Sequence, residues 1–148
     1  MGNTGFTRWD NAHLVEQVIT KSRIVFVSAW ASDPTLSQAF VPWYFSCVPN
    51  TNQQADILIH EIYDRRKSIK VAALSDEEYD SKLALNSFVI KSKTTGNGDL
   101  LQFFYDSSCN NFNNLLDSLN NGNINCIILF GQPSASIKIL QQMRQKKM

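Results

Sequence analysis

IKVAALSDEEY, residues 69–79, is the stretch on which the fold of this chain depends. Its apolar part, 69–74, is too short for a helix and too apolar for a half-exposed edge strand, which predicts a buried strand. Ser75 and Glu78 fit an S-x-x-E capping box, so we expect a helix to open with Ser75 as its N-cap. A buried strand followed at once by a helix is half of a β-α-β unit. Ligands of open α/β sheets bind at the carboxyl ends of the strands, where Tyr79 would lie one turn into the helix.

Strands and helices alternate along the rest of the chain. The pattern of apolar residues predicts further strands at 23–27, 43–47, 100–105 and 124–130, and helices at 11–22, 34–40, 50–67, 77–93, 112–121 and from 133 onward. Asn50 and Gln53 are the expected opening of the third helix, and Pro133 lies at the start of the last one. This alternation predicts an α/β fold of three layers, with a doubly wound, mainly parallel sheet of at least four strands.

Composition limits the classes of function. The chain has 148 residues, of which 43% are hydrophobic, enough for one domain with a buried core. Its net charge of +1 does not favour binding to nucleic acid or to an anionic membrane. No apolar run approaches the roughly 20 residues that cross a bilayer, and the first 20 residues lack the apolar segment of a signal peptide.

The signatures of catalysis and of metal binding are missing from the sequence. Three cysteines without C-x-x-C spacing and two histidines cannot be assembled into a zinc site. There is no dinucleotide-binding G-x-G-x-x-G, no P-loop and no G-x-S-x-G nucleophile elbow. The acidic residues at 76–78 are explained by the first turn of a helix, where the helix dipole favours negative charge. We therefore expect no enzyme activity, no metal and no cofactor.

Four loops are predicted to follow strands and to open on one edge of the sheet, at 28–32, 75–79, 105–111 and 130–133. They contain hydroxyl groups, aromatic rings and helix N-termini, and a helix N-terminus presents free N–H groups that suit a carboxylate. These features predict a binding site for a carboxylate or a similar anion. Taken singly, each residue is explained more simply as a helix cap or a turn residue, and that alternative stays open.

Four segments carry a resemblance to a known family. They are VFVSAWASDPTLSQAF at 25–40, WYFSCVPNTNQQADILIHEI at 43–62, IKVAALSDEEYD at 69–80 and NNFNNLLDSLNNGNINCIILFGQPSASIKILQQMRQ at 110–145. In order and spacing they resemble segments of the type I periplasmic binding proteins, which serve branched-chain amino acid and amide ABC transporters. In that family two α/β lobes close on an amino acid. The resemblance implies a partial chain, with 1–48 as the tail of the first lobe and 49–148 as the second lobe.

The resemblance also implies four ligand-binding residues. Trp30 and Ser32 fall in the loop that holds the ligand's carboxylate and amine. Tyr79 matches the aromatic residue that lines the cleft from the second lobe, and Asp106 lies near the position of an acid that meets the amine. The chain departs from the family at Trp30, which replaces a small residue, and at Asp80, which replaces a glycine.

By resemblance, the chain is a solute-binding receptor component of an ABC transport system with an amino acid or related small carboxylate as ligand. This implies a permease partner for the full-length parent and a periplasmic or extracellular location. Two alternatives remain: a sensory or regulatory ligand-binding domain of the same fold, and a flavodoxin-like protein that binds FMN. A third is a fragment that binds no ligand. A partial chain would also leave apolar sheet edges uncovered, so self-association into a homodimer or a higher oligomer is expected.

Overall fold

The computed structural model describes residues 17–28, 32, 34–35, 43–96 and 99–148 of the chain. The chain forms two compact units, Met1–Gln54 and Ala55–Met148. The predicted helix at 34–40 lies mostly outside the described residues, as does the first part of the helix predicted at 11–22. Whether these units correspond to two lobes divided at residue 48 stays a prediction.

The second unit is built on a parallel sheet. Its strands are β3 (Lys70–Ser75), β4 (Asp99–Phe104) and β5 (Cys126–Phe130), in the order β4-β3-β5. Val71 pairs with Leu100 on one side and with Cys126 on the other, and both pairings are parallel. The prediction of a parallel sheet around residues 69–74 is confirmed. The described residues place three strands in this sheet, so the expectation of at least four in one sheet is not met by the described part of the chain.

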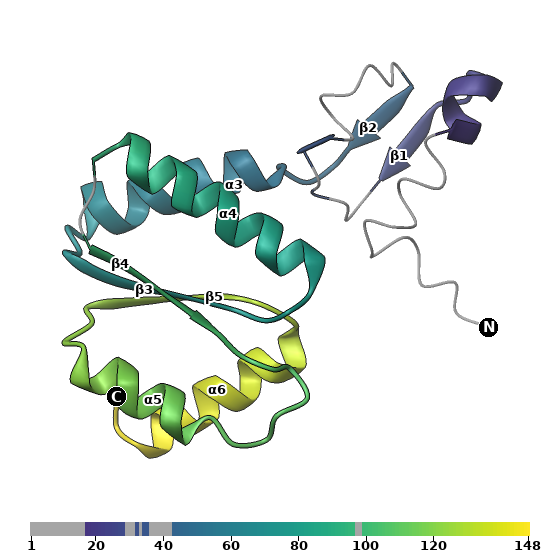
Figure 1. The fold of residues 1–148 in the computed structure, drawn as a ribbon. Coiled ribbons are helices and arrows are strands. Elements are labelled where there is room, and N and C mark those ends of the chain that lie inside the picture. The colour runs from purple at the N-terminus through teal and green to yellow at the C-terminus, as the bar shows by residue number, and fades with distance from the viewer. Residues whose placement is uncertain (1–16, 29–31, 33, 36–42, 97–98) are drawn as a thin grey trace. The chain divides into compact units, whose positions relative to one another are not determined.

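Helices cover both faces of the sheet (Figure 1). One layer contains α3 (Thr51–Ile59), the π-helix η1 (His60–Arg65) and α4 (Tyr79–Thr94), and the other contains α5 (Asn113–Asn121) and α6 (Pro133–Gln145). Side chains of a strand alternate between its faces. On β3, Val71 packs with Phe88 of α4, whereas Leu74 packs with Leu116 of α5 and Ile139 of α6. The central strand is therefore buried on both sides, which is the reason for its unbroken apolar run.

The helix predicted at 50–67 begins as expected. The backbone N–H of Asn50 donates to Gln53 Oε1 at 3.0 Å, and the N–H of Gln53 donates to Asn50 Oδ1 at 3.0 Å, which is a reciprocal capping box. After Ile59 the helix widens into η1, where the N–H of Arg66 donates to the carbonyl of Glu61 at 3.0 Å. That change to π-helical bonding was not expected.

The predicted capping box at Ser75 is wrong. Ser75 is the last residue of β3, its hydroxyl donates to the carbonyl of Asp76 at 3.0 Å, and α4 begins only at Tyr79 with Glu78 as its N-cap. Ser75 pairs with residues of both neighbouring strands, so it continues the sheet and cannot also cap a helix. Tyr79 is accordingly the first residue of the helix rather than one turn into it.

In the first unit, β1 (Phe26–Ser28) and β2 (Tyr44–Ser46) pair in parallel. The rings of Phe26 and Tyr44 stack with their centroids 5.8 Å apart. These strands lie at the apolar runs predicted at 23–27 and 43–47. Among the described residues, no helix is long and apolar enough to span a membrane, and no group of three or more His, Cys, Asp or Glu residues is placed to hold a metal ion.

Candidate functional site

The three strands of the second unit end side by side. Ser75, the last residue of β3, pairs with Phe104 at the end of β4 and with Phe130 at the end of β5. The loops that follow these strands therefore emerge together at the carboxyl edge of the sheet, and α4 and α6 both begin there (Figure 1). This edge is the candidate functional site, because ligands of open parallel sheets bind at it.

The buried carboxylate of Asp76 joins two of these loops. Asp76 is 0% exposed, and its N–H donates to the carbonyl of Phe130 at 3.2 Å. Its Oδ1 accepts the N–H of Glu78 at 3.1 Å, and its Oδ2 accepts the N–H of Gln132 at 2.8 Å. Glu78 and Gln132 are the N-caps of α4 and α6. One side chain thus holds the first turns of two helices at the same edge.

The loop after β4 reaches the same point through Tyr105. Its N–H donates to the carbonyl of Ser75 at 3.0 Å, and its ring meets Phe112 edge-on with centroids 5.7 Å apart. A methyl group placed on Gly131 would lie 1.9 Å from the Tyr105 hydroxyl oxygen and 3.0 Å from Asp76 Oδ2. Residue 131 must therefore be a glycine for the corner to close around this tyrosine.

The Tyr105 hydroxyl is an unsatisfied polar group. The residue is 6% exposed, and its oxygen has no hydrogen-bond partner among the described residues. The pKa of the Tyr105 phenol is raised, chiefly by burial and further by the Asp76 carboxylate. The nearby Ser136 hydroxyl acts in the opposite direction, although the two groups do not reach hydrogen-bond geometry. These effects favour the neutral phenol.

Asp106, the first acid of the loop after β4, is exposed to solvent. Its Oδ1 accepts hydrogen bonds from the hydroxyl and the N–H of Ser108, at 2.7 and 2.8 Å. The hydroxyl and then the N–H of Ser108 lower the pKa of Asp106 below its ordinary value. The side chain is an ionised carboxylate held by a tight turn, which suits it to an ammonium group.

Helix α6 holds the rest of this loop in place. Gln142 Nε2 donates to the carbonyl of Asn110 at 2.8 Å, and Lys138 Nζ donates to Asn110 Oδ1 at 2.7 Å. The N–H of Phe112, the N-cap of α5, donates to Gln142 Oε1 at 2.9 Å. The loop that begins with Asp106 is thus hydrogen-bonded at its C-terminal end, at Asn110 and Phe112, to helix α6.

Of the four residues predicted to bind ligand, the structure places Tyr79 and Asp106 at the same edge. Tyr79 opens α4 and is 46% exposed, so its ring is accessible. Trp30 lies outside the described residues. Ser32, in the first unit, is partly buried, and its carbonyl accepts the N–H of Thr51 at 2.9 Å. The ligand-binding roles of all four residues stay predictions.

The residues that organise this edge were not among the predicted ones. Asp76 was interpreted as an acid of a helix's first turn, and the structure instead buries it between two corners. Tyr105 was predicted only as the end of a strand and the start of a loop, and Gly131 only as part of a loop. A usable signal was present, because an Asp directly after one buried strand and a Gly directly after another are typical of tight strand-to-helix corners.

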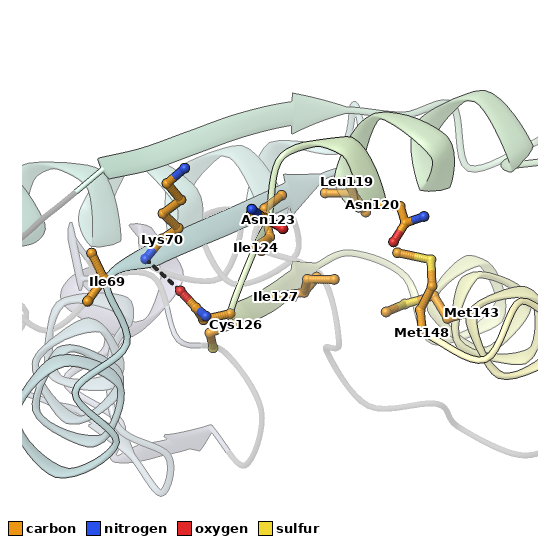
Figure 2. A pocket seen from close by; sticks show the side chains of 11 residues that line it. Ile69, Lys70, Leu119, Asn120, Asn123, Ile124, Cys126, Ile127, Met143 and Met148 are labelled. Carbon is orange, nitrogen blue, oxygen red and sulfur yellow. Dashed lines mark hydrogen bonds between the residues drawn. The ribbon is translucent and has the colours of Figure 1, made fainter.

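Among the hollows on the second unit, two lie at opposite edges of the sheet. One, of about 680 Å³, is at the opposite edge of the sheet, between the start of β5 and the ends of α5 and α6. Figure 2 shows Met143 and Met148 on one side of it and Lys70 on the other, where the N–H of Lys70 donates to Asn125 Oδ1 at 3.3 Å. The other, of about 350 Å³, adjoins the carboxyl edge beside Phe104. The larger hollow contains none of the predicted ligand-binding residues.

No family model matches the sequence, and no curated protein matches it. Solved structures match along nearly the whole chain. A leucine-binding protein, LivK, from Thermotoga maritima has a TM-score of 0.80 and 18% identity, over 97% of this chain and 41% of its own. A branched-chain amino acid ABC transporter protein from Thermus thermophilus, with bound valine, has a TM-score of 0.77 and 13% identity, over 95% of this chain and 37% of its own.

A solute-binding protein of an ABC transporter from Rhodopseudomonas palustris HaA2, in complex with p-hydroxybenzoic acid, has a TM-score of 0.72 and 12% identity, over 94% of this chain and 39% of its own. The neighbours are binding proteins rather than enzymes. At these identities the likeness shows the fold, and the predicted resemblance to the type I periplasmic binding proteins is confirmed at that level. The chain spans about two fifths of the length of these neighbours.

Proposed function

We propose that this chain is part of a solute-binding receptor of an ABC transport system and that its ligand is an amino acid or a related small carboxylate. The observation that carries the proposal is the carboxyl edge of the second unit, where an accessible tyrosine and an ionised aspartate follow neighbouring parallel strands. The neighbours' names include leucine, valine and p-hydroxybenzoic acid, and each of these compounds has a carboxyl group.

The chemistry of the edge fits such a ligand. The Tyr79 ring supplies an apolar wall, and Asp106 supplies a negative charge for an ammonium group. The side chains of the two N-caps, Glu78 and Gln132, make no hydrogen bond to the first turns of α4 and α6. Helix N-termini carry partial positive charge, which favours a ligand carboxylate nearby. Trp30 and Ser32 are included in the proposal as ligand-binding residues, on the resemblance of the sequence segment that contains them.

The rest of the receptor follows from the same proposal. The chain spans about two fifths of its structural neighbours, so the complete ligand cleft belongs to a protein with two full lobes. Residues 1–48 would be the tail of the first lobe and residues 49–148 the second. That protein would deliver its solute to an ABC permease and would work in the periplasm or outside the cell. It would carry out no catalysis and use no cofactor.

Calorimetric titration tests the proposal. The chain, and the full-length parent where it is longer, are titrated with leucine, valine, isoleucine and 4-hydroxybenzoate, with FMN as a control for the flavodoxin-like alternative. Saturable binding of an amino acid by the parent supports the receptor function, and release of the solute to a reconstituted permease separates a transport receptor from a sensory domain. A parent that binds FMN and none of the carboxylates would refute the proposal.

A further inference from the structure

Beyond the ligand class, the carboxyl edge contains a buried set of contacts made by Asp76, Tyr105 and Gly131, which we call the lock. We propose that Asp76 is a positioning residue: its carboxylate, with the Tyr105 ring closed over Gly131, sets the geometry of the corners that present Tyr79 and the start of α6. This inference rests on the proposed function for its biological meaning, but its structural part can be tested without any ligand.

The first argument is the burial of a charge. Asp76 is 0% exposed, and the ion pairs of the described residues do not involve it. A buried carboxylate is costly unless hydrogen bonds compensate for the water that it loses. Here the compensation comes from the N–H groups of Glu78 and Gln132. Moving either corner would remove a partner from a buried charge, so each corner is held against displacement.

The second argument is where those two N–H groups lie. Glu78 and Gln132 are N-caps, and an N-cap fixes where its helix begins and in which direction it runs. Neither residue caps its helix with its own side chain. Asp76 instead accepts the backbone N–H groups of the two N-cap residues themselves, and so fixes the position of both caps. Tyr79 is the next residue after Glu78, so a change at Asp76 is transmitted to it through one peptide unit.

The third argument is the fit of Tyr105 to Gly131. A methyl group on residue 131 would come within 1.9 Å of the tyrosine oxygen, and this distance requires one of the two to move. The tyrosine is restrained by its backbone hydrogen bond to Ser75 and by its contact with Phe112. Residue 131 would therefore move, and with it the N–H of Gln132 that Asp76 binds. The loops after β3, β4 and β5 are thus coupled, because a displacement of one of them changes its contacts with the other two.

The decisive variant is Asp76→Asn, which keeps the shape of the side chain and removes its charge. One amide N–H₂ must then face a backbone N–H, so at least one hydrogen bond is lost. By ¹⁵N NMR on the 148-residue chain, we expect the amide protons of Glu78 or Gln132 to move upfield and to exchange about 10- to 100-fold faster, as for loss of a hydrogen bond to a charged group. The amides of Ala72 and Ala73 in the middle of β3 should keep their protection.

A matched control is Asp117→Asn, which removes an exposed carboxylate paired with Lys146 and should leave the amides of Glu78 and Gln132 unchanged. Unchanged Glu78 and Gln132 amides in Asp76→Asn would overturn the lock. So would a uniform loss of protection across the sheet, because that result indicates general destabilisation rather than positioning.

A second pair of variants tests the lock if Asp76→Asn does not fold. Gly131→Ala should shift the Gln132 amide, and adding Tyr105→Phe should return it toward its wild-type position, because the closest contact is to the hydroxyl oxygen. Gly122→Ala, where the nearest contacts are 3.3 Å from flexible Ile124 side-chain atoms, is the control. If Tyr105→Phe gives no rescue, the steric part of the lock is wrong.

Binding then connects the lock to function. In a parent that binds an amino acid, Asp76→Asn should weaken binding about 10-fold or more, whereas Asp117→Asn should not. If the parent binds none of the tested solutes, the proposed function fails. The NMR experiment still shows whether Asp76 holds the amides of Glu78 and Gln132 in place. If the NMR changes occur and affinity is unaffected, Asp76 is structural only and its positioning role is overturned.

Discussion

The backbone N–H of Gln132 donates a 2.8 Å hydrogen bond to the carboxylate of Asp76, 56 residues earlier in the chain. The bond joins the corner after β3 to the corner after β5, and it lies at the edge of the sheet where Tyr79 and Asp106 are also found. The loops that follow two separate strands are thereby held next to each other. The predictions below concern this surface and the core beneath it.

Replacing Tyr79 by alanine should weaken ligand binding by about 1–3 kcal/mol, the scale of one buried apolar side chain. The reason is loss of the ring that is 46% exposed in this chain and would be covered by a bound ligand. Calorimetry on the full-length parent measures the change, and Tyr79→Phe, which keeps the ring, is the control. Equal affinity of Tyr79→Ala and wild type would remove Tyr79 from the site.

Asp106→Asn should weaken binding of leucine or valine much more than binding of 4-hydroxybenzoate, which has no amine. Because the pKa of Asp106 is lowered, its carboxylate stays ionised as pH falls and becomes protonated only below the ordinary aspartate range. Amino acid affinity should therefore be flat from about pH 7 to about pH 5, as far as Asp106 decides it. Ser108→Ala should raise the pKa of Asp106, which an NMR titration of its carboxyl carbon can follow. A pKa unchanged by that variant would contradict the assigned cause.

Two isoleucines of α6 should differ sharply in their contribution to stability. Ile139 is 0% exposed and packs in the core with Leu74 and Leu116, whereas Ile137 is 54% exposed. Ile139→Ala should lower the free energy of unfolding by about 2–5 kcal/mol, and Ile137→Ala by about 0.5 kcal/mol or less. Urea unfolding of both variants provides the comparison. Similar costs for the two would mean that α6 packs on the sheet by another face.

Tyr105→Phe should make the folded chain less sensitive to alkaline pH. The folded-state pKa of Tyr105 is raised, so the unfolded chain releases this proton first, and stability falls as pH rises above the ordinary phenol value of about 10. Below that value the variant should be as stable as wild type or slightly more so, because the lost hydroxyl has no hydrogen-bond partner among the described residues. Urea unfolding at neutral and alkaline pH measures both effects. A parallel loss of stability in the two proteins would contradict the prediction.

The chain should self-associate through an edge of its sheet. Leu101 and Phe104 of the edge strand β4 are 41% and 55% exposed, and uncovered apolar edges invite pairing with another strand. Light scattering should report a dimer or larger species at high concentration. The double variant Leu101→Lys with Phe104→Lys should shift the chain toward monomer, whereas the same change at exposed Ile137 should not. A wild-type monomer at high concentration would exclude this association.

The segments that begin at Asn50 and at Ser75 show how much of a helix start can be predicted from local sequence. Both segments fit the same pattern, and only the one at Asn50 forms the reciprocal hydrogen bonds. Ser75 is drawn into the sheet because Phe104 and Phe130 extend the pairing of β3 by one residue. Whether a strand ends at 74 or at 75 depends on its neighbours, and those neighbours are distant in sequence.

The sequence by itself determined the alternation of strands and helices, the burial of β3 and the parallel direction of its neighbours. These features follow from local periodicity and from the geometry of β-α-β connections, which a short window of residues already contains. Only the tertiary structure decided that the buried Asp76 carboxylate joins two loops by hydrogen bonds and that the missing side chain of Gly131 leaves space for Tyr105. Both depend on contacts between chain segments that meet only after the sheet has formed, and no local pattern of apolar and polar residues records such contacts.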